Sequence, residues 1–115
     1  MKLEGEGKLL RIFVGEADKL GRKPVYEAIV LKAREIGMAG ATVLRGVESF
    51  GARSRIHTAK ILRLSEDLPI IVEIVDTAEK IDRFIATAGE ILEEAGSGGL
   101  ITEERAHIIH YTPGK

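Results

Sequence analysis

The segment Pro69–Val75 (PIIVEIV) constrains the fold of this chain more than any other, because it predicts a strand that is apolar on both faces. Side chains alternate across a strand, so the even-numbered residues from Ile70 to Ile74 lie on one face, with Ile71 and Val75 on the other. Helices that cover one face leave the second face open, and an open apolar face of this kind indicates an interface. The sequence therefore predicts an oligomer whose sheets face inward.

Two segments repeat apolar residues at helical spacing. Val25–Ile36 forms the first apolar stripe, and Gly37 after it is a typical helix stop. Ile81–Ala95 forms the second stripe over about four turns. Asp76 and Glu79, three residues apart, resemble a pair that caps the start of this second helix. We therefore expect one helix before the central strand in the sequence and one after it.

Short apolar segments rich in β-forming residues supply the remaining strands. The element order is β-α-β-(long loop)-β-α-β, which predicts an α+β, ferredoxin-like fold, an antiparallel sheet with both helices on one face. The long loop, Phe50–Leu68, is irregular and basic, and we expect it to be functional or mobile, with a short hairpin of its own. Besides Pro69–Val75, the predicted strands are Lys8–Gly15, Gly40–Glu48, Leu100–Thr102 and Ala106–Tyr111.

Composition bounds the class of protein. The 115 residues suit one domain spanning residues 1–115. Lys and Arg number 17 against 18 Asp and Glu, so the net charge of −1 lacks the basic excess usual in nucleic-acid binders. The chain has no cysteine, a charged N-terminus, and no apolar run near the roughly 20 residues of a membrane span. We expect a cytoplasmic protein that neither binds nucleic acid nor inserts into a membrane.

Patterns for catalysis and metal binding are weak. The spacing favours no Ser-His-Asp arrangement, there is no thiol nucleophile, and no paired carboxylates mark a cleft. His107 and His110 are three residues apart, so on one strand they would point to opposite faces and could not share an ion. The sequence therefore predicts neither an enzyme nor a metal site, and His110 is kept as a candidate neighbour of a bound phosphate.

Four segments, taken in order, resemble the PII family of nitrogen-signalling proteins. Gly40–Val43 (GATV) and Ser49–Arg53 (SFGAR) resemble a strand of that family and the start of its T-loop. Asp67–Asp76 (DLPIIVEIVD) resembles the strand after the T-loop, including its glutamate. Gly96–Gly99 (GSGG) stands where the family has its phosphate-binding B-loop.

Within this group, Gly40–Gly46 (GATVLRG) and His57–Ala59 (HTA) are similar to the PII-like family called domain of unknown function 190. The resemblance implies a ferredoxin-like homotrimer with three clefts between subunits. Each cleft would bind an adenine nucleotide as an effector, with no cofactor. The residues carried over are Thr42 facing the adenine, Phe50, Gly51, Ala52 and Arg53 at the base of the loop, Glu73 beside the cleft, and Gly96, Ser97, Gly98 and Gly99 offering backbone N–H groups to the phosphates.

Two of these assignments have a structural alternative. A glycine-rich turn after a helix also fits a plain helix stop followed by a tight turn. Glu73 interrupts an apolar strand, and a buried carboxylate must be paired or hydrogen-bonded. A structural ion pair at Glu73 is therefore as compatible with the sequence as a contact with a ligand.

The chain departs from the PII pattern where the phosphates would bind. Gly99 replaces the family's B-loop lysine, and Ile108–Tyr111 has no counterpart of the two arginines on the last strand. Each missing cation removes a charge-assisted contact of roughly 1.5–3 kcal/mol. We therefore expect AMP or ADP to bind better than ATP. No tyrosine lies between Phe50 and Leu68, so regulation by tyrosine uridylylation is not expected.

The expected function is regulatory. A nucleotide at the cleft would order the Phe50–Leu68 loop, and a partner protein (a transporter, a channel or an enzyme) would read that conformation. Two alternatives stay open. An RNA-recognition module has the same element order, but it stacks bases on several aromatic residues, and only 4% of this chain is aromatic. A trimer of the same fold could instead respond to another small molecule or a metal, without nucleotide.

Overall fold

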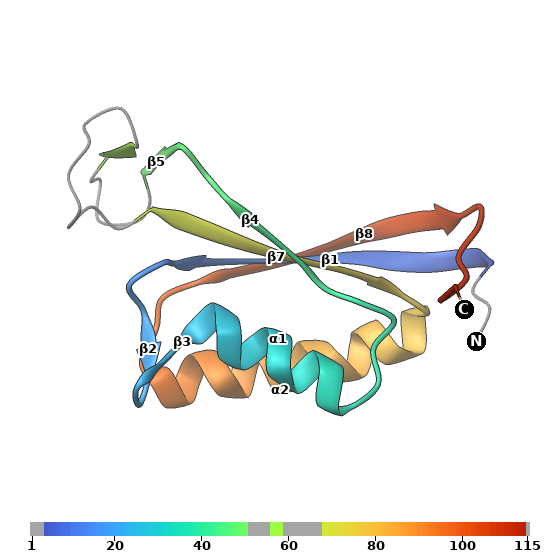
Figure 1. The fold of residues 1–115 in the computed structure, drawn as a ribbon, viewed down its shortest axis with the longest axis horizontal. Helices are drawn as coiled ribbons and strands as arrows, with labels where there is room; N and C mark the ends of the chain where they lie inside the picture. The colour runs from blue at the N-terminus through green and yellow to red at the C-terminus, as the bar shows by residue number, and fades with distance from the viewer. Residues whose placement is uncertain (1–3, 51–55, 59–67, 115) are drawn as a thin grey trace.

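The computed structural model describes residues 4–50, 56–58 and 68–114 (Figure 1). Within these residues, a four-stranded antiparallel sheet has the order β4-β7-β1-β8, and helices α1 and α2 cover one of its faces. The expected ferredoxin-like α+β fold is therefore confirmed. The main elements are β1 (Gly5–Gly15), α1 (Val25–Glu35), β4 (Thr42–Arg45), β7 (Pro69–Asp76), α2 (Ala78–Ala95) and β8 (Leu100–Ile108).

Two short hairpins complete the described elements. The first, β2 (Lys19–Leu20) with β3 (Lys23–Pro24), leads into α1. The second, β5 (Glu48–Phe50) with β6 (Ile56–Thr58), belongs to the long loop and confirms the hairpin expected there. In the described part of the chain, no helix is both long and apolar enough to cross a bilayer.

The core lies between the sheet and the helices. Ile12 of β1 pairs with Val72 of β7, and both side chains are fully buried. Ile29 of α1 and Phe84 of α2 are fully buried against them. Burying a side chain of this size stabilises the fold by about 1.5–3 kcal/mol. The core residues are Leu10, Ile12, Val14, Val25, Ile29, Ala33, Ile70, Val72, Ile74, Ile81, Phe84 and Ala88.

The opposite face of the sheet is not covered by the described residues. Val75 of β7 is 40% exposed there, with Leu44 of β4 at 44% and Leu100 of β8 at 55%. The second apolar face predicted from Pro69–Val75 is therefore present, while the self-association that would cover it stays a prediction. We call this surface the open face; its residues include Leu9, Arg11, Phe13, Thr42, Leu44, Ile71, Glu73, Val75, Leu100 and Glu104.

The start of α2 differs from the sequence prediction. Thr77 is the N-cap, and its hydroxyl oxygen accepts the Lys80 N–H at 3.3 Å. Asp76 is fully buried, and its Oδ2 accepts the backbone N–H of Ala39 at 2.8 Å. The predicted Asp76–Glu79 capping pair is therefore wrong, because Asp76 is used to hold the segment that leads into β4.

Two strand predictions also need correction. The two short closing strands are one continuous strand, β8. The polar residues between them stay in the strand because they form ion pairs with β1, Glu103 with Lys8 and Glu104 with Arg11. The predicted strand Gly40–Glu48 is shorter, and β4 ends at Arg45. Gly46 follows, and its N–H donates to the Pro69 carbonyl at 2.8 Å.

Candidate functional site

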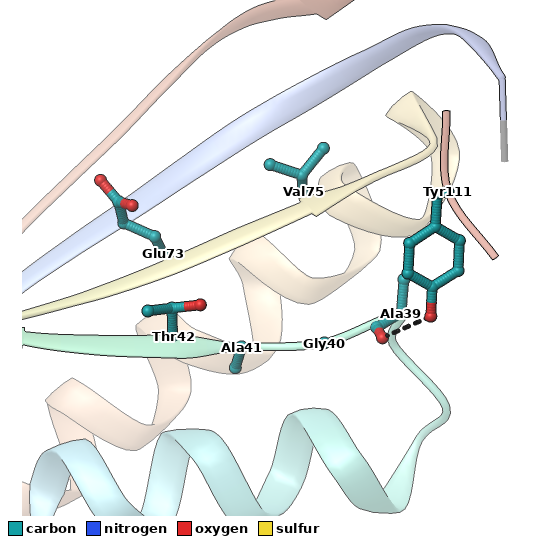
Figure 2. A pocket seen from close by; sticks show the side chains of 7 residues that line it. All are labelled: Ala39, Gly40, Ala41, Thr42, Glu73, Val75 and Tyr111. Carbon is teal, nitrogen blue, oxygen red and sulfur yellow. Dashed lines mark hydrogen bonds between the residues drawn. The ribbon is translucent and has the colours of Figure 1, made fainter. Parts of the chain in front are cut away.

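A pocket of about 230 Å³ lies where the segment before β4 passes the end of β7 (Figure 2). Three stretches of chain far apart in sequence line it: the residues entering β4, the end of β7, and the residues after β8. Figure 2 shows Glu73 and Thr42 toward one end of the pocket and Tyr111 at the other. The lining residues are Ala39, Gly40, Ala41, Thr42, Glu73, Val75 and Tyr111.

The β4–β7 register explains why Thr42 and Glu73 meet. The two residues are direct cross-strand partners, so their side chains lie on the same face of the sheet. Val75, two residues after Glu73, lies on that face as well. This is the open face, so the pocket sits at its β4 edge. The structure thus brings together two residues, Thr42 and Glu73, that the sequence assigned to one cleft.

Side chains from distant elements fix the wall before β4. The N–H of Ala39 is held by Asp76 Oδ2, and the C=O of Ala39 accepts the Tyr111 hydroxyl at 3.0 Å. The other oxygen of Asp76 accepts the Thr77 N–H at 2.7 Å. Lys80, in the first turn of α2, donates to the Gly37 carbonyl at 3.2 Å. Both backbone groups of Ala39 are therefore engaged, and this wall of the pocket has a defined shape.

The polar end of the pocket is acidic. The guanidinium of Arg11 donates from Nε to Glu73 at 2.9 Å and from Nη1 to Glu104 at 2.7 Å. Glu73 first and Glu104 second raise the pKa of Arg11, so this group stays positively charged. The structural ion pair considered for Glu73 is present, and the same carboxylate lines the pocket. Such an end suits a ligand N–H or O–H donor better than a phosphate.

The glycine turn lies away from this pocket. Gly96 ends α2 in the left-handed conformation, at φ +64°. The pocket is lined by Val75, shortly before α2 begins at Ala78, and the 18 residues of this helix span about 27 Å at 1.5 Å per residue. Within one subunit the turn is therefore not joined to Thr42 and Glu73.

Local hydrogen bonds also occupy part of the turn. The N–H of Gly96 donates to the backbone carbonyl of Glu93, and the N–H of Ser97 donates to that of Leu92, as at an ordinary helix stop. The Ser97 hydroxyl donates to Asp18 at 2.8 Å, which places a carboxylate beside the turn. At most the N–H groups of Gly98 and Gly99 remain for an anion. The phosphate role of the turn stays a prediction, and the helix-stop alternative accounts for Gly96 and Ser97.

The other predicted residues fall in several places. His110 lies beyond the end of β8 and is exposed, next to Tyr111. The backbone of Phe50 ends β5. Gly51, Ala52 and Arg53 lie outside the described residues. Among the residues that the structure describes, no three His, Cys, Asp or Glu side chains gather as a metal site would require.

Comparison with known sequences decides the family. The model of the family DUF190, described as "Uncharacterized ACR", matches residues 7–108. The chain belongs to the DUF190 family. A UPF0166 protein of Aquifex aeolicus is 40% identical over 103 residues, covering 90% of this chain and 93% of the relative. A UPF0166 protein of Methanocaldococcus jannaschii is 33% identical over 103 residues, covering 90% and 92%.

A solved structure extends the likeness to the fold. This DUF190 chain superposes on CPII, a nitrogen regulatory PII-like protein from Thiomonas intermedia K12, with a TM-score of 0.60 and 16% identity. The match covers 90% of this chain and 88% of CPII. That structure of CPII holds ADP, AMP and bicarbonate. The PII-like fold of the DUF190 chain, expected from the sequence resemblance, is therefore confirmed.

Sequence reasoning missed five of the seven lining residues of this DUF190 chain: Ala39, Gly40, Ala41, Val75 and Tyr111. Ala39 and Val75 carry no chemical signal in a sequence, because backbone groups and a small apolar surface are what they contribute. Tyr111 was assigned to a closing strand, whereas β8 ends at Ile108 and Tyr111 reaches the opposite edge of the sheet. The available signal was the rarity of such residues, since Tyr111 is one of two tyrosines in a chain without tryptophan.

Proposed function

We propose that this DUF190 protein is a non-catalytic, PII-like regulatory protein that binds an adenine nucleotide at a cleft between the subunits of a homotrimer. The observation that carries the proposal is the position of the pocket: Thr42 and Glu73 line it together, on the edge of an uncovered apolar sheet face. The presence of ADP and AMP in the structure of PII-like CPII supports the choice of ligand.

The lining of the pocket fits the nucleoside part of such a ligand. Ala41 and Val75 offer apolar surface, and Thr42 offers a hydroxyl group. The carboxylate of Glu73 accepts hydrogen bonds, which matches the amino group of adenine or a ribose hydroxyl. A phosphate at the same end would meet this carboxylate at close range and be repelled. The base and sugar therefore enter the pocket, and the phosphates point away from Glu73.

The size of the pocket requires a second wall. Ligand sites usually enclose about 300–1,000 Å³, and the pocket within one subunit has about 230 Å³. It opens on the β4 edge, beside the open face. A neighbouring subunit packed on that face would close the pocket. The glycine turn Gly96–Gly99 and His110 then act as phosphate neighbours only if a subunit interface brings them to the cleft.

The open face supports the trimer. Exposed Leu44, Val75 and Leu100 lie on it, and their burial would stabilise an assembly through the hydrophobic effect. At its centre, Arg11 compensates Glu73 and Glu104, so the charged groups are already paired before association. Pairing lowers the cost of burying these charges in an interface.

Titration calorimetry with ADP tests the ligand. We expect saturable binding near one ADP per subunit, and Glu73→Gln should weaken it by about tenfold to a hundredfold, because a charged acceptor contributes roughly 1.5–3 kcal/mol. The matched control is Glu90→Gln, which changes an exposed carboxylate on α2 far from the pocket. Absence of any heat at millimolar ADP, with trimers present in sedimentation, would reject the nucleotide. A monomer in sedimentation would reject the cleft.

The regulatory output is the remaining part of the proposal. Nucleotide at the cleft orders residues 50–68, and a partner protein such as a transporter, channel or enzyme binds the ordered state. Thr42 of the pocket is the first residue of β4, and the loop follows at the end of β5, so two short strands join the pocket to the loop. Hydrogen exchange tests it: saturating ADP should slow exchange across residues 50–68. Unchanged exchange there, with ADP bound by calorimetry, would refute the switch and leave the binding site standing.

RNA binding is disfavoured by the composition of the open face. Modules with this topology stack bases on several sheet aromatics. Across β1, β4, β7 and β8, the described strands of the sheet, Phe13 is the only Phe, Tyr or Trp, and the one histidine, His107, is on the helix-covered side. A filter-binding assay with mixed single-stranded RNA should therefore give no retention at micromolar protein.

A further inference from the structure

The C-terminal segment reaches across the sheet. Strand β8 is one edge of the sheet and β4 is the other. After Ile108 the chain leaves β8, and three residues later the Tyr111 hydroxyl donates to Ala39, just before β4. The segment therefore passes the ends of β1 and β7 to reach the pocket. In Figure 1 it descends from the end of β8, close to the N-terminus.

A glycine makes room for this passage. A Cβ placed on Gly7 would lie 2.7 Å from Cδ1 of Ile108 and 2.6 Å from the Asp76 carbonyl oxygen. Both distances are too short for ordinary contact, so the side chain of Ile108 occupies the space above Gly7. The last residue of β8 is thus packed over β1, in the direction of β7 and the pocket. The chain is therefore already packed against the sheet at Ile108, three residues before Tyr111.

We propose that Tyr111 is a ligand-binding residue of this pocket, packing its ring against the planar base, and that the C-terminal segment docks as part of the occupied site. This inference rests on the proposed nucleotide function and adds to it a residue from outside every PII-like motif in the chain. A tyrosine suits the role because it offers a large apolar ring at a low cost in side-chain entropy.

The hydrogen bond of Tyr111 fixes where the ring lies. Its hydroxyl is bound to the C=O of Ala39, while the N–H of the same residue is bound to Asp76. Figure 2 shows the ring at the end of the pocket opposite Glu73, with Val75 between them. A base that contacts Glu73 at one end of the pocket and extends past Val75 therefore reaches the ring of Tyr111 at the other end. Pocket filling and docking of the segment stabilise each other by thermodynamic linkage.

Tyrosine emission tests the contact directly. The chain has no tryptophan and two tyrosines, so Tyr26→Phe leaves Tyr111 as the single strong emitter. Tyr26 lies on α1, away from the residues that line the pocket. Titrating this variant with ADP, against free tyrosine amide in the same ADP solutions, should give emission changes that saturate at the concentration where calorimetry saturates. Stacking of a base on the ring quenches its emission.

Each outcome of this titration decides something. Calorimetric binding with unchanged Tyr111 emission overturns the inference and leaves the proposed function intact. Absence of both heat and emission change rejects the nucleotide function, and this inference falls with it.

Two substitutions separate the ring from its hydrogen bond. Tyr111→Phe keeps the ring and should weaken ADP binding less than fivefold, whereas Tyr111→Ala should weaken it about tenfold or more, as loss of a base–aromatic contact does. Far-UV circular dichroism and sedimentation check that both variants keep the fold and assembly. Tyr111→Ala with an unchanged ADP affinity would overturn the inference. If that variant does not fold, the emission titration still decides the matter.

Discussion

Arg11 and Glu73 are cross-strand partners on β1 and β7, and their charged groups lie 2.9 Å apart. The same guanidinium also holds Glu104 of β8, so it links three neighbouring strands. Because Glu73 lines the pocket, the candidate site is connected by one side chain to the centre of the open face. The surface proposed for assembly and the pocket proposed for the ligand are therefore parts of one structure.

Replacing Arg11 should weaken the assembly. In Arg11→Met, Glu73 and Glu104 lose their shared cation, and burying two unpaired carboxylates at an interface is costly. We expect the trimer to dissociate at protomer concentrations at least about tenfold higher than those at which the unchanged trimer dissociates, which is about 2.7 kcal/mol per trimer because the dissociation constant scales with the square of that concentration. Sedimentation equilibrium over a range of concentrations measures this.

Lys8 supplies a matched control for Arg11. It also bridges two carboxylates, Asp82 and Glu103, but on the helix-covered side of the sheet. Lys8→Met should leave the dissociation concentration unchanged. If both variants dissociate alike, the effect is a general loss of stability and the open face is not the interface. An Arg11→Met trimer as tight as the original would contradict the prediction outright.

Asp76→Asn should destabilise the subunit and distort the pocket. The buried carboxylate accepts two N–H groups, from Ala39 and Thr77, and an asparagine can accept only one while turning its own N–H₂ group toward the other. We expect the free energy of unfolding to fall by about 1–3 kcal/mol, the usual cost of an unsatisfied buried group. Urea denaturation at a fixed protomer concentration measures it.

Asp82→Asn is the comparison for Asp76. Asp82 is an exposed carboxylate of α2 paired with Lys8, and surface pairs contribute less than about 1 kcal/mol. Equal losses in the two variants would mean that the Asp76 hydrogen bonds add nothing beyond a surface pair, and the account of the Ala39 wall would be wrong.

Most of the fold followed from periodicity in the sequence. The stripes at Val25–Ile36 and Ile81–Ala95 became α1 and α2 because burial against one sheet face selects apolar residues at helical spacing. The closing strand was misjudged because Glu103 and Glu104 interrupt its apolar pattern. Their ion pairs with β1 satisfy them in place, and such partners cannot be read from local sequence.

The sequence also predicted some residues of the candidate site and not others. Thr42 and Glu73 were assigned through motifs, and the β4–β7 register places them side by side. Asp76 was mistaken for a helix cap because Asp three residues before Glu is a common cap, and its partner Ala39 is 37 residues away. Tyr111 contacts Ala39 across 72 residues, a relation that depends on the path of the chain after β8.

Gly7→Ala adds a single methyl group, yet it should clearly destabilise the folded subunit. The new methyl group would meet the Asp76 carbonyl and the Ile108 side chain at 2.6 and 2.7 Å, so one of them must move. Overpacking of this kind costs about 1–3 kcal/mol. We expect a lower unfolding midpoint in urea. Since Ile108 precedes the Tyr111 segment, ADP affinity should fall in the same variant.

Gly89→Ala should have the opposite effect on stability. Gly89 lies within α2, and a Cβ there would meet nothing within 4 Å. Alanine in a helix interior is favoured over glycine by roughly 0.5–1 kcal/mol. This variant should be stabilised, with unchanged ADP binding. Destabilisation by Gly89→Ala would mean that α2 is packed against something in the assembly that the subunit does not contain.

Nucleotide preference should favour AMP and ADP over ATP. The lysine of the PII B-loop is absent at Gly99, and the space there is filled: a Cβ would lie 3.1 Å from both the Phe13 carbonyl and Leu92. The adjoining Ser97 is bound to the carboxylate of Asp18, which adds negative charge beside the turn. A third phosphate would therefore gain little attraction and meet repulsion, so ATP should bind no more tightly than ADP. Calorimetry with the three nucleotides at one ionic strength measures the order, because screening affects phosphate contacts.

Asp18→Asn sharpens this test. It keeps a hydrogen-bond acceptor for Ser97 and Gly15 and removes the negative charge. If the turn lies at the phosphates, the variant should bind ATP more tightly, by severalfold, while AMP changes little, since the added charge of ATP is what the carboxylate repels. Equal affinities for ATP before and after the substitution would show that Gly96–Gly99 is a helix stop and no part of the phosphate site. ATP bound tenfold more tightly than ADP by the unchanged protein would refute the preference itself.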